Sequence, residues 1–115
     1  MIYQRKFDIR VWVFLNYDSS LYFFPEGYLR TSSSEFAIDP NNPDDQYVHL
    51  TNNAIQKYSQ SYGVFEDGNQ MSYAQFQDYL DSHGFSGYSV KDHTVEVMKS
   101  LIMRSMLATR KLLDP

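Results

Sequence analysis

The clearest pattern in the chain is an alternation of charged and apolar residues at positions 6–10, followed at once by an apolar run at 11–15. Alternate residues of a strand share a face, so Lys6, Asp8 and Arg10 would point one way and their apolar neighbours the other. Two cations around one anion suit the rim of a cleft, where a phosphate or carboxylate completes the charge balance. The alternative is an edge strand whose charges are only solvated, because half-buried strands routinely alternate in this way.

Further apolar runs predict a small sheet in the N-terminal half. Strands are expected over residues 6–15, 21–24 and 28–31, separated by turns rich in Asn, Asp, Ser, Pro and Gly. This spacing is typical of an antiparallel meander in a single sheet, so Arg30 on the third strand would emerge close to the charged face of the first. Residues 32–46 contain many Ser, Asn, Asp and Pro residues and predict a surface loop.

The rest of the chain predicts helices over about 52–58, 72–83 and 90–113. Thr51 or Asn52 is the expected cap of the first helix, whose free backbone N–H groups would suit an anion, although most such caps only end a helix. Cap signatures at Ser72 and Ser89 precede the other two helices. The methionines of the last helix are interpreted as core filler, since Met packs adaptably.

Composition limits the class of protein. The 115 residues, 43% of them hydrophobic, are enough for one modest core. The apolar runs are too short to span a bilayer and no signal sequence is visible, so neither membrane insertion nor secretion is expected. The absence of cysteine excludes disulfides and thiolate zinc sites, and together with the lack of a glycosylation sequon it favours a cytosolic location.

The formal net charge of −4 is unevenly distributed. Residues 31–90 are strongly acidic, whereas both ends of the chain are slightly basic. No basic stripe interleaved with exposed aromatic residues occurs, so nucleic-acid binding is not expected.

Few residues match a known catalytic or metal-binding pattern. His49, His83 and His93 lie far apart in sequence without a second ligand at helical spacing, so no metal ligands are predicted within the chain. No nucleophile elbow, phosphate-binding loop or dinucleotide fingerprint occurs. Glu66 and Asp67 could be paired acid and base carboxylates, but beside a glycine they are interpreted as a solvated turn.

What remains is a set of separated polar elements, namely the charged row at 6–10, Arg30, and the run that holds His49, Thr51 and Asn52. They offer cations for a phosphate or carboxylate, and hydroxyl and amide groups for a ribose or phosphate. This is the inventory of a nucleotide site. Residue types alone do not choose ATP over another anionic ligand.

Three ordered segments, at residues 6–10, 28–33 and 49–57, resemble the tubulin tyrosine ligase family, the ATP-grasp ligases that add tyrosine, glutamate or glycine to tubulin. The likeness continues through residues 62–63, 66–71 and 76–80 and so covers most of the chain. It implies an α+β fold in which antiparallel strands of the N-terminal half pack with C-terminal helices. Residues 1–115 would then be an incomplete segment of an ATP-grasp domain.

The resemblance also implies roles for individual residues. The residues expected at ATP are Lys6, Asp8, His49, Thr51 and Asn52. Arg10 and Arg30 are the expected catalytic and substrate-binding cations. Arg10 would face the acidic C-terminal tail of tubulin, and Arg30 would hold the carboxylate of the free amino acid or a phosphate in transfer. Asn53 would lie beside the amino-acid substrate.

In the chemistry of this family, ATP phosphorylates a carboxylate and an amino group attacks the acyl-phosphate, while cations and Mg²⁺ stabilise the developing charge. The family's magnesium ligands come in a later segment. This chain is therefore expected to be a middle piece that is inactive alone, from a parent enzyme in the cytoplasm, at microtubules or cilia.

Which amino acid is added, and whether catalysis occurs at all, stays open at the level of sequence. Residues 66–71 look most like the tyrosine-adding member and residues 76–84 also like the glycine-adding relatives, so tyrosine is the first expectation. The alternatives are a polyglutamylase or glycylase of the same family, a non-catalytic tubulin-binding module, and a small autonomous domain with only structural resemblance.

Overall fold

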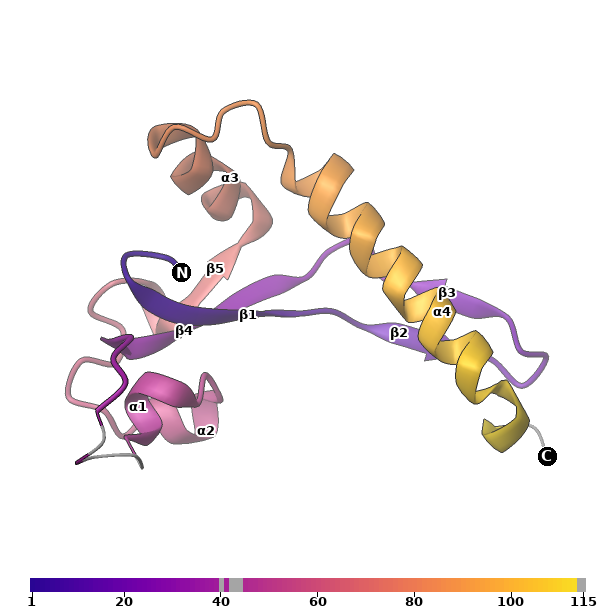
Figure 1. Cartoon of the computed structure of the whole chain (residues 1–115), viewed down its shortest axis with the longest axis horizontal. Coiled ribbons are helices and arrows are strands. Elements are labelled where there is room, and N and C mark those ends of the chain that lie inside the picture. The colour runs from indigo at the N-terminus through magenta and orange to yellow at the C-terminus, as the bar shows by residue number, and fades with distance from the viewer. Residues whose placement is uncertain (40, 42–44, 114–115) are drawn as a thin grey trace. The chain divides into compact units, whose positions relative to one another are not determined.

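The computed structural model describes residues 1–39, 41 and 45–113 (Figure 1), and the chain divides into two compact units. Unit 1 consists of Met1–Val11 and Gly27–Ser72, and unit 2 consists of Trp12–Glu26 and the chain from Tyr73 onward. Both units contain antiparallel strands and helices, which confirms the expected mixture of these elements.

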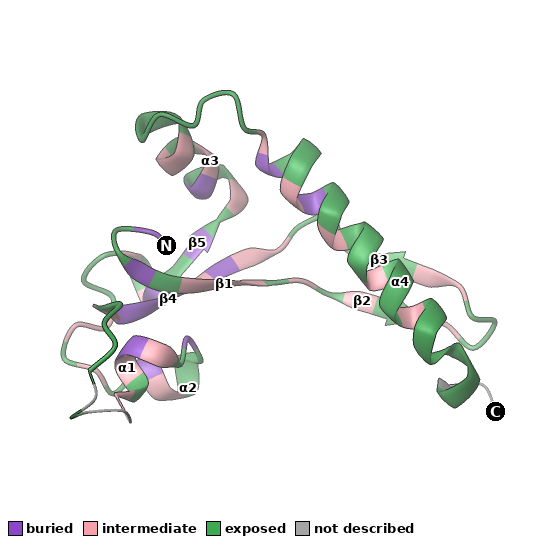
Figure 2. Cartoon of the chain, viewed as in Figure 1, coloured by how far each residue is buried: buried purple, intermediate pink, exposed green. Residues whose placement is uncertain are grey.

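Unit 1 is built on an antiparallel sheet in the order β1-β4-β5, formed by β1 (Arg5–Arg10), β4 (Tyr28–Glu35) and β5 (Gln70–Ser72). Two short helices, α1 (Gln46–His49) and α2 (Asn53–Gln56), and the 3-10 helix η1 (Asp67–Asn69) complete the unit. Its buried positions concentrate on β4, the central strand (Figure 2). The buried apolar residues of unit 1 are Ile2, Leu29, Val48 and Met71.

The expected single meander is wrong. β1 ends at Arg10, and the apolar run beyond it forms β2 (Val13–Leu15), which pairs with β3 (Leu21–Phe23) in a separate two-stranded sheet. β1 instead pairs directly with β4. The alternation of charged and apolar residues stops at Arg10, and the apolar run beyond it pairs with the equally apolar β3, so the two halves of the expected strand belong to different sheets.

The expected loop at 32–46 is wrong at both ends, because β4 continues to Glu35 and α1 begins at Gln46. Residues 40 and 42–44 of that loop lie outside the described residues. The serines at 32–34 form a bulge, since Phe7 pairs with Thr31 whereas Arg5 pairs with Glu35, which leaves three residues of β4 opposite one of β1. Serine-rich sequence predicts a loop because it offers no apolar face to a sheet. Here long-range polar contacts hold it as a strand.

Unit 2 holds the β2–β3 hairpin, α3 (Tyr73–Ser82), the π-helix η2 (Val90–Val95) and α4 (Glu96–Leu113). α3 begins and ends within one residue of the predicted range 72–83. η2 and α4 together cover the predicted range 90–113, although its first six residues are π-helical. The cap at Ser89 is also confirmed, because its hydroxyl accepts from the backbone N–H of Asp92 at 3.1 Å. Among the described residues, no helix is both long and apolar enough to span a bilayer.

The expected cap of the first helix is confirmed in position only, and the expected role of the methionines is wrong. Asn52 occupies the N-cap position of α2 without a side-chain cap bond, and the hydroxyl of Thr51 bonds elsewhere, to Asp8. The methionines of α4 are not core filler, because Met98 and Met106 are only partly buried and Met103 is 48% exposed. Helical periodicity identified the apolar face of α4, but within unit 2 that face is not fully covered.

Candidate functional site

Asp8 lies at the centre of a charged cluster on β1 and β4. Arg30 Nε and Nη2 donate to the two carboxylate oxygens of Asp8 at 2.9 and 2.8 Å. The pair forms because the two residues are direct register partners on adjacent antiparallel strands. Thr51 donates its hydroxyl hydrogen to the same carboxylate. This two-pronged contact fixes the plane of the Arg30 guanidinium group.

Lys6 and Arg10 flank Asp8 on the same face of β1. Lys6 Nζ donates to the backbone oxygen of His49 at 2.8 Å, and this contact ties the end of α1 to β1. The imidazole of His49 packs edge-on against the ring of Phe36, with 5.9 Å between the ring centroids. Arg10 is exposed at the end of β1. The cluster therefore has three cations around one carboxylate. Lys6 and Arg30 are hydrogen-bonded, whereas none of the described residues bonds to the guanidinium group of Arg10.

The ionisation of this cluster is set by its contacts. Burial alone would raise the pKa of Asp8, but hydrogen bonds from Arg30 and Thr51 and the charges of Arg30 and Arg10 outweigh it and hold the pKa below its ordinary value. The hydrogen bond to Asp8 raises the pKa of Arg30. The side chains of Arg30 and Asp8 are 18% and 35% exposed, so the pair stays charged and accessible to solvent.

The two asparagines of the expected site, Asn52 and Asn53, are not hydrogen-bonded to this cluster among the described residues. Asn52 is exposed, and Asn53 Oδ1 accepts from the hydroxyl of Tyr62 at 3.1 Å. In the part of the chain that the structure describes, neither hydrogen-bonds to Asp8 or its neighbours. The structure thus brings together Lys6, Asp8, Arg30, Thr51 and the backbone of His49, with Arg10 next along β1.

A second arginine-carboxylate pair, between Arg5 and Glu66, was not predicted from the sequence. Arg5 is fully buried, and its Nη1 donates to Glu66 Oε2 at 3.0 Å while its Nη2 donates to Oε1. The hydroxyl of Thr31 donates to the same carboxylate at 2.8 Å, and the ring of Phe65 lies 4.0 Å from the Arg5 guanidinium carbon. With its side chain 8% exposed, Glu66 is not part of a solvated turn, so that expectation is wrong.

The turn after Glu66 explains how its side chain comes to face inward. Gly68 has a φ of +60° and Asn69 a φ of 53°, a left-handed pair that reverses the chain at η1. Asp67, on the outside of this turn, is exposed. The glycine indicated a turn in the sequence, but not which of the two neighbouring carboxylates would point into the unit.

Two buried amides close the bulge of β4 and position the segment beside Asp8. Gln56 accepts from the backbone N–H of Ser33 at 2.8 Å, and it donates to the backbone oxygens of Tyr47, at 3.3 Å, and Leu50. Asn69 donates to Thr31 O at 3.1 Å and to Ser33 Oγ at 2.9 Å. Because Gln56 holds both β4 and the stretch just before Thr51, it places the partners of Lys6 and Asp8 without touching either.

The arrangement suits a polyanion better than a metal ion. Three cations against one neutralised carboxylate offer charge-assisted hydrogen bonds to phosphate oxygens. Lysine has three N–H donors, and Lys6 uses one of them on His49, so two remain for a ligand. Among the described residues, no three His, Asp or Glu side chains gather closely enough to hold a metal ion. These residues thus fit a nucleotide phosphate and do not fit Mg²⁺.

Comparisons with known proteins connect this geometry to a family. The model of the "Tubulin-tyrosine ligase family" matches residues 1–114. Tubulin glycylase 3B of Tetrahymena thermophila is 39% identical over 70% of this chain and 7% of its own length. The probable tubulin polyglutamylase TTLL9 of Bos taurus is 33% identical over 95% of this chain and 23% of its own length. Protein monoglycylase TTLL8 of Homo sapiens is 36% identical over 73% of this chain and 10% of its own length. The chain thus spans less than a quarter of the length of each of these relatives.

Proposed function

Because the chain belongs to the tubulin-tyrosine ligase family, we propose that it is part of an ATP-dependent ligase that joins an amino acid to tubulin. The similar relatives are named as glycylases and a polyglutamylase, so we favour glycine or glutamate as the added amino acid. Tyrosine, the first expectation from the sequence, has no support among these relatives. An ATP-grasp fold for the complete domain and a location in the cytoplasm, at microtubules or cilia, are part of the same proposal.

The cluster around Asp8 is the observation that carries this proposal. Its contacts require β1, β4 and the stretch before α2 to meet, and these are three of the segments that resemble the family. A surface charge that only keeps a protein soluble does not need a two-pronged partner and a hydroxyl donor on one carboxylate. The ordered contacts therefore favour a binding role over solvation alone.

Each residue of the cluster has a distinct proposed role. Lys6, held against His49, donates to phosphate oxygens of ATP, while Thr51 and Asn52 lie on the nucleotide side. Asp8 keeps Arg30 oriented, so that the free edge of its guanidinium group can receive a carboxylate or a phosphate. Arg10, which is exposed, faces the acidic tail of tubulin, and Asn53 lies on the amino-acid side. Bound ATP would supply the phosphoryl group that activates a carboxylate for attack by an amine.

The test uses a complete enzyme that carries this segment. It replaces Lys6 and Arg10, the two ends of the charged row, one at a time. Lys6→Ala should raise the KM for ATP about tenfold, since one charge-assisted contact to phosphate is lost. Arg10→Ala should raise the KM for tubulin and leave that for ATP unchanged. Lys91→Ala, an exposed lysine of unit 2, is the matched control. Unchanged constants for both cluster variants would refute the proposed roles.

A non-catalytic tubulin-binding module is the second candidate, because the exposed Arg10 would contact an acidic tail without any phosphoryl transfer. A module of this kind would contact tubulin through Arg10, and the complete protein would show no turnover at any magnesium concentration. Amino-acid incorporation into tubulin, followed with a radiolabelled amino acid, distinguishes the two functions directly. Incorporation that requires ATP and Mg²⁺ excludes the second candidate.

A further inference from the structure

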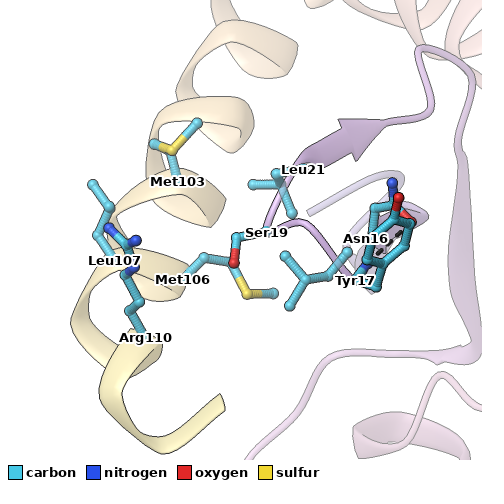
Figure 3. Close-up of a pocket in the computed structure, with 9 residues that line it drawn as sticks. Asn16, Tyr17, Ser19, Leu21, Met103, Met106, Leu107 and Arg110 are labelled. Carbon is cyan, nitrogen blue, oxygen red and sulfur yellow. Dashed lines mark hydrogen bonds between the residues drawn. The ribbon is translucent and has the colours of Figure 1, made fainter. Parts of the chain in front are cut away.

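Unit 1 buries a network of polar side chains next to the cluster around Asp8. In unit 2, the groove between the β2–β3 hairpin and α4 has mainly apolar walls of leucine and methionine (Figure 3). In unit 1, by contrast, Arg5, Thr31 and Asn69 are all buried. Replacing a buried ion pair by apolar residues of similar volume is often neutral or stabilising, so stability alone does not account for such a network.

Thr31 links this network to Arg30. The two residues are neighbours on β4, so their side chains point to opposite faces of the strand. Arg30 reaches Asp8 on one face, and on the other face the hydroxyl of Thr31 donates to Glu66 Oε2 at 2.8 Å. The backbone oxygen of Thr31 accepts from Asn69 Nδ2 at 3.1 Å. The side chain and the backbone of Thr31 are therefore both held by residues of the same turn.

The strand is also held on the other side of Arg30. Leu29 is fully buried and pairs with Met71 on β5, and Arg30 itself pairs with Gln70. The backbone of Arg30 therefore has fixed neighbours before and after it. Its two hydrogen bonds to the Asp8 carboxylate, at 2.9 and 2.8 Å, depend on this, because a two-pronged contact requires the guanidinium plane to stay aligned with the carboxylate.

We propose that Thr31 and Glu66 are positioning residues for Arg30, an inference that rests on the proposed function of this segment. Arg5 holds the Glu66 carboxylate inward through two hydrogen bonds, and Glu66 in turn holds the hydroxyl of Thr31. Thr31 then fixes the stretch of β4 from which the guanidinium group of Arg30 meets a carboxylate or phosphate. The buried face of the strand thus sets the geometry of the open face, although none of its polar groups touches a ligand.

The test compares two substitutions of Thr31 in a complete enzyme that carries this segment. Thr31→Val keeps the branched shape of the side chain and removes its hydroxyl, so kcat/KM for the amino acid joined to tubulin should fall about tenfold. Thr31→Ser keeps the hydroxyl and should recover most of that loss. A valine variant as active as the wild type would overturn the proposal, and so would a serine variant no better than the valine variant.

Ile2→Val is the matched control for a loss of stability alone. It removes one methylene group from another fully buried residue of unit 1 without changing a polar contact, and Ile→Val changes in a core typically cost about 0.5–1.5 kcal/mol. Its kcat/KM should stay within about twofold of the wild-type value. A loss in this control as large as that of Thr31→Val would overturn the proposal, since any weakening of unit 1 would then have the same effect.

A double variant shows whether Thr31 acts through Arg30. Arg30→Lys keeps the charge but loses the two-pronged contact, so its own loss of kcat/KM tests the proposed function first. In that background Thr31→Val should cost less than about twofold, because the group that it positions is gone. A second full loss would overturn the proposal and leave Thr31 a structural role. Full activity of Arg30→Lys would instead refute the proposed role of Arg30, and this inference with it.

Discussion

Two arginine-carboxylate pairs in unit 1 have the same chemistry and opposite surroundings. In the pair of Arg5 and Glu66 the side chains are 0% and 8% exposed, and Thr31 and Phe65 occupy the space around them. In the pair of Arg30 and Asp8 they are 18% and 35% exposed, and Lys6 and Arg10 stand beside them. The closed pair, Arg5 with Glu66, is shut off from a ligand by burial even though Arg5 Nε has no hydrogen-bond partner among the described residues, whereas the open pair, Arg30 with Asp8, has spare donors that solvent reaches. Burial, more than residue type, therefore separates a structural pair from a candidate site.

The largest effect is expected from breaking the closed pair. Glu66→Gln removes the only carboxylate that hydrogen-bonds to Arg5 among the described residues and leaves a buried cation, which should lower the free energy of unfolding by about 3–5 kcal/mol. Urea unfolding followed by tryptophan fluorescence measures it. The double variant Arg5→Met with Glu66→Leu should recover most of the loss, because it removes both charges at once. A loss below about 1 kcal/mol for the single variant would mean that water reaches this pair.

The next largest effect is expected at Gln56, whose amide joins the bulge of β4 to the stretch before Thr51. Gln56→Ala leaves the Ser33 N–H and two backbone oxygens without a partner and should cost about 2–3 kcal/mol. In a complete enzyme it should also raise the KM for ATP, since the stretch before Thr51 loses its anchor. Gln60→Ala, at an exposed position, is the control for stability. If Gln56→Ala destabilises the protein but leaves the KM unchanged, Gln56 has no positioning role.

The sequence predicted that Arg30 would lie close to the charged row, but it predicted neither the pair with Asp8 nor the closed pair. The alternation at Lys6 to Arg10 is local, and direct pairing of β1 with β4, in place of the expected meander, brings Arg30 beside Asp8. Glu66 is separated from Arg5 by 61 positions, and nothing in its own neighbourhood distinguishes it from a solvated carboxylate. Thr51 was misjudged in the same way. Its local pattern indicated a helix cap, but its hydroxyl donates to the carboxylate of Asp8, 43 positions earlier in the chain.

The open pair should have a smaller effect, and one that depends on pH. The pKa of folded Asp8 lies below its unfolded value, so its contribution is complete above that unfolded pKa and is lost as pH falls through the folded one. Asp8→Asn should therefore cost at most about 1 kcal/mol near neutral pH and progressively less below about pH 4. Urea midpoints of both proteins, measured across this range, give the difference. A gap that widens in acid would contradict the assigned ionisation.

The smallest effect is expected at the exposed end of the row. Arg10→Ala should change the free energy of unfolding by less than about 0.5 kcal/mol, because no described residue hydrogen-bonds to its guanidinium group. Thermal unfolding measures it, with Lys91→Ala as the reference variant. A clear destabilisation would show that Arg10 belongs to the structural part of the cluster, and its proposed role toward tubulin would lose its basis.

The bulge in β4 has a consequence for the order in which the protein forms. Its irregular backbone is closed by Arg5, Gln56 and Asn69, and the last of these contacts spans 38 positions of the chain. On the ribosome, where residues emerge one after another, β1 and β4 can meet early but stay unfinished until Asn69 has appeared. A pause in translation shortly before that point would leave the strand pair incomplete, with the other edge of β4 unpaired and able to associate with other chains.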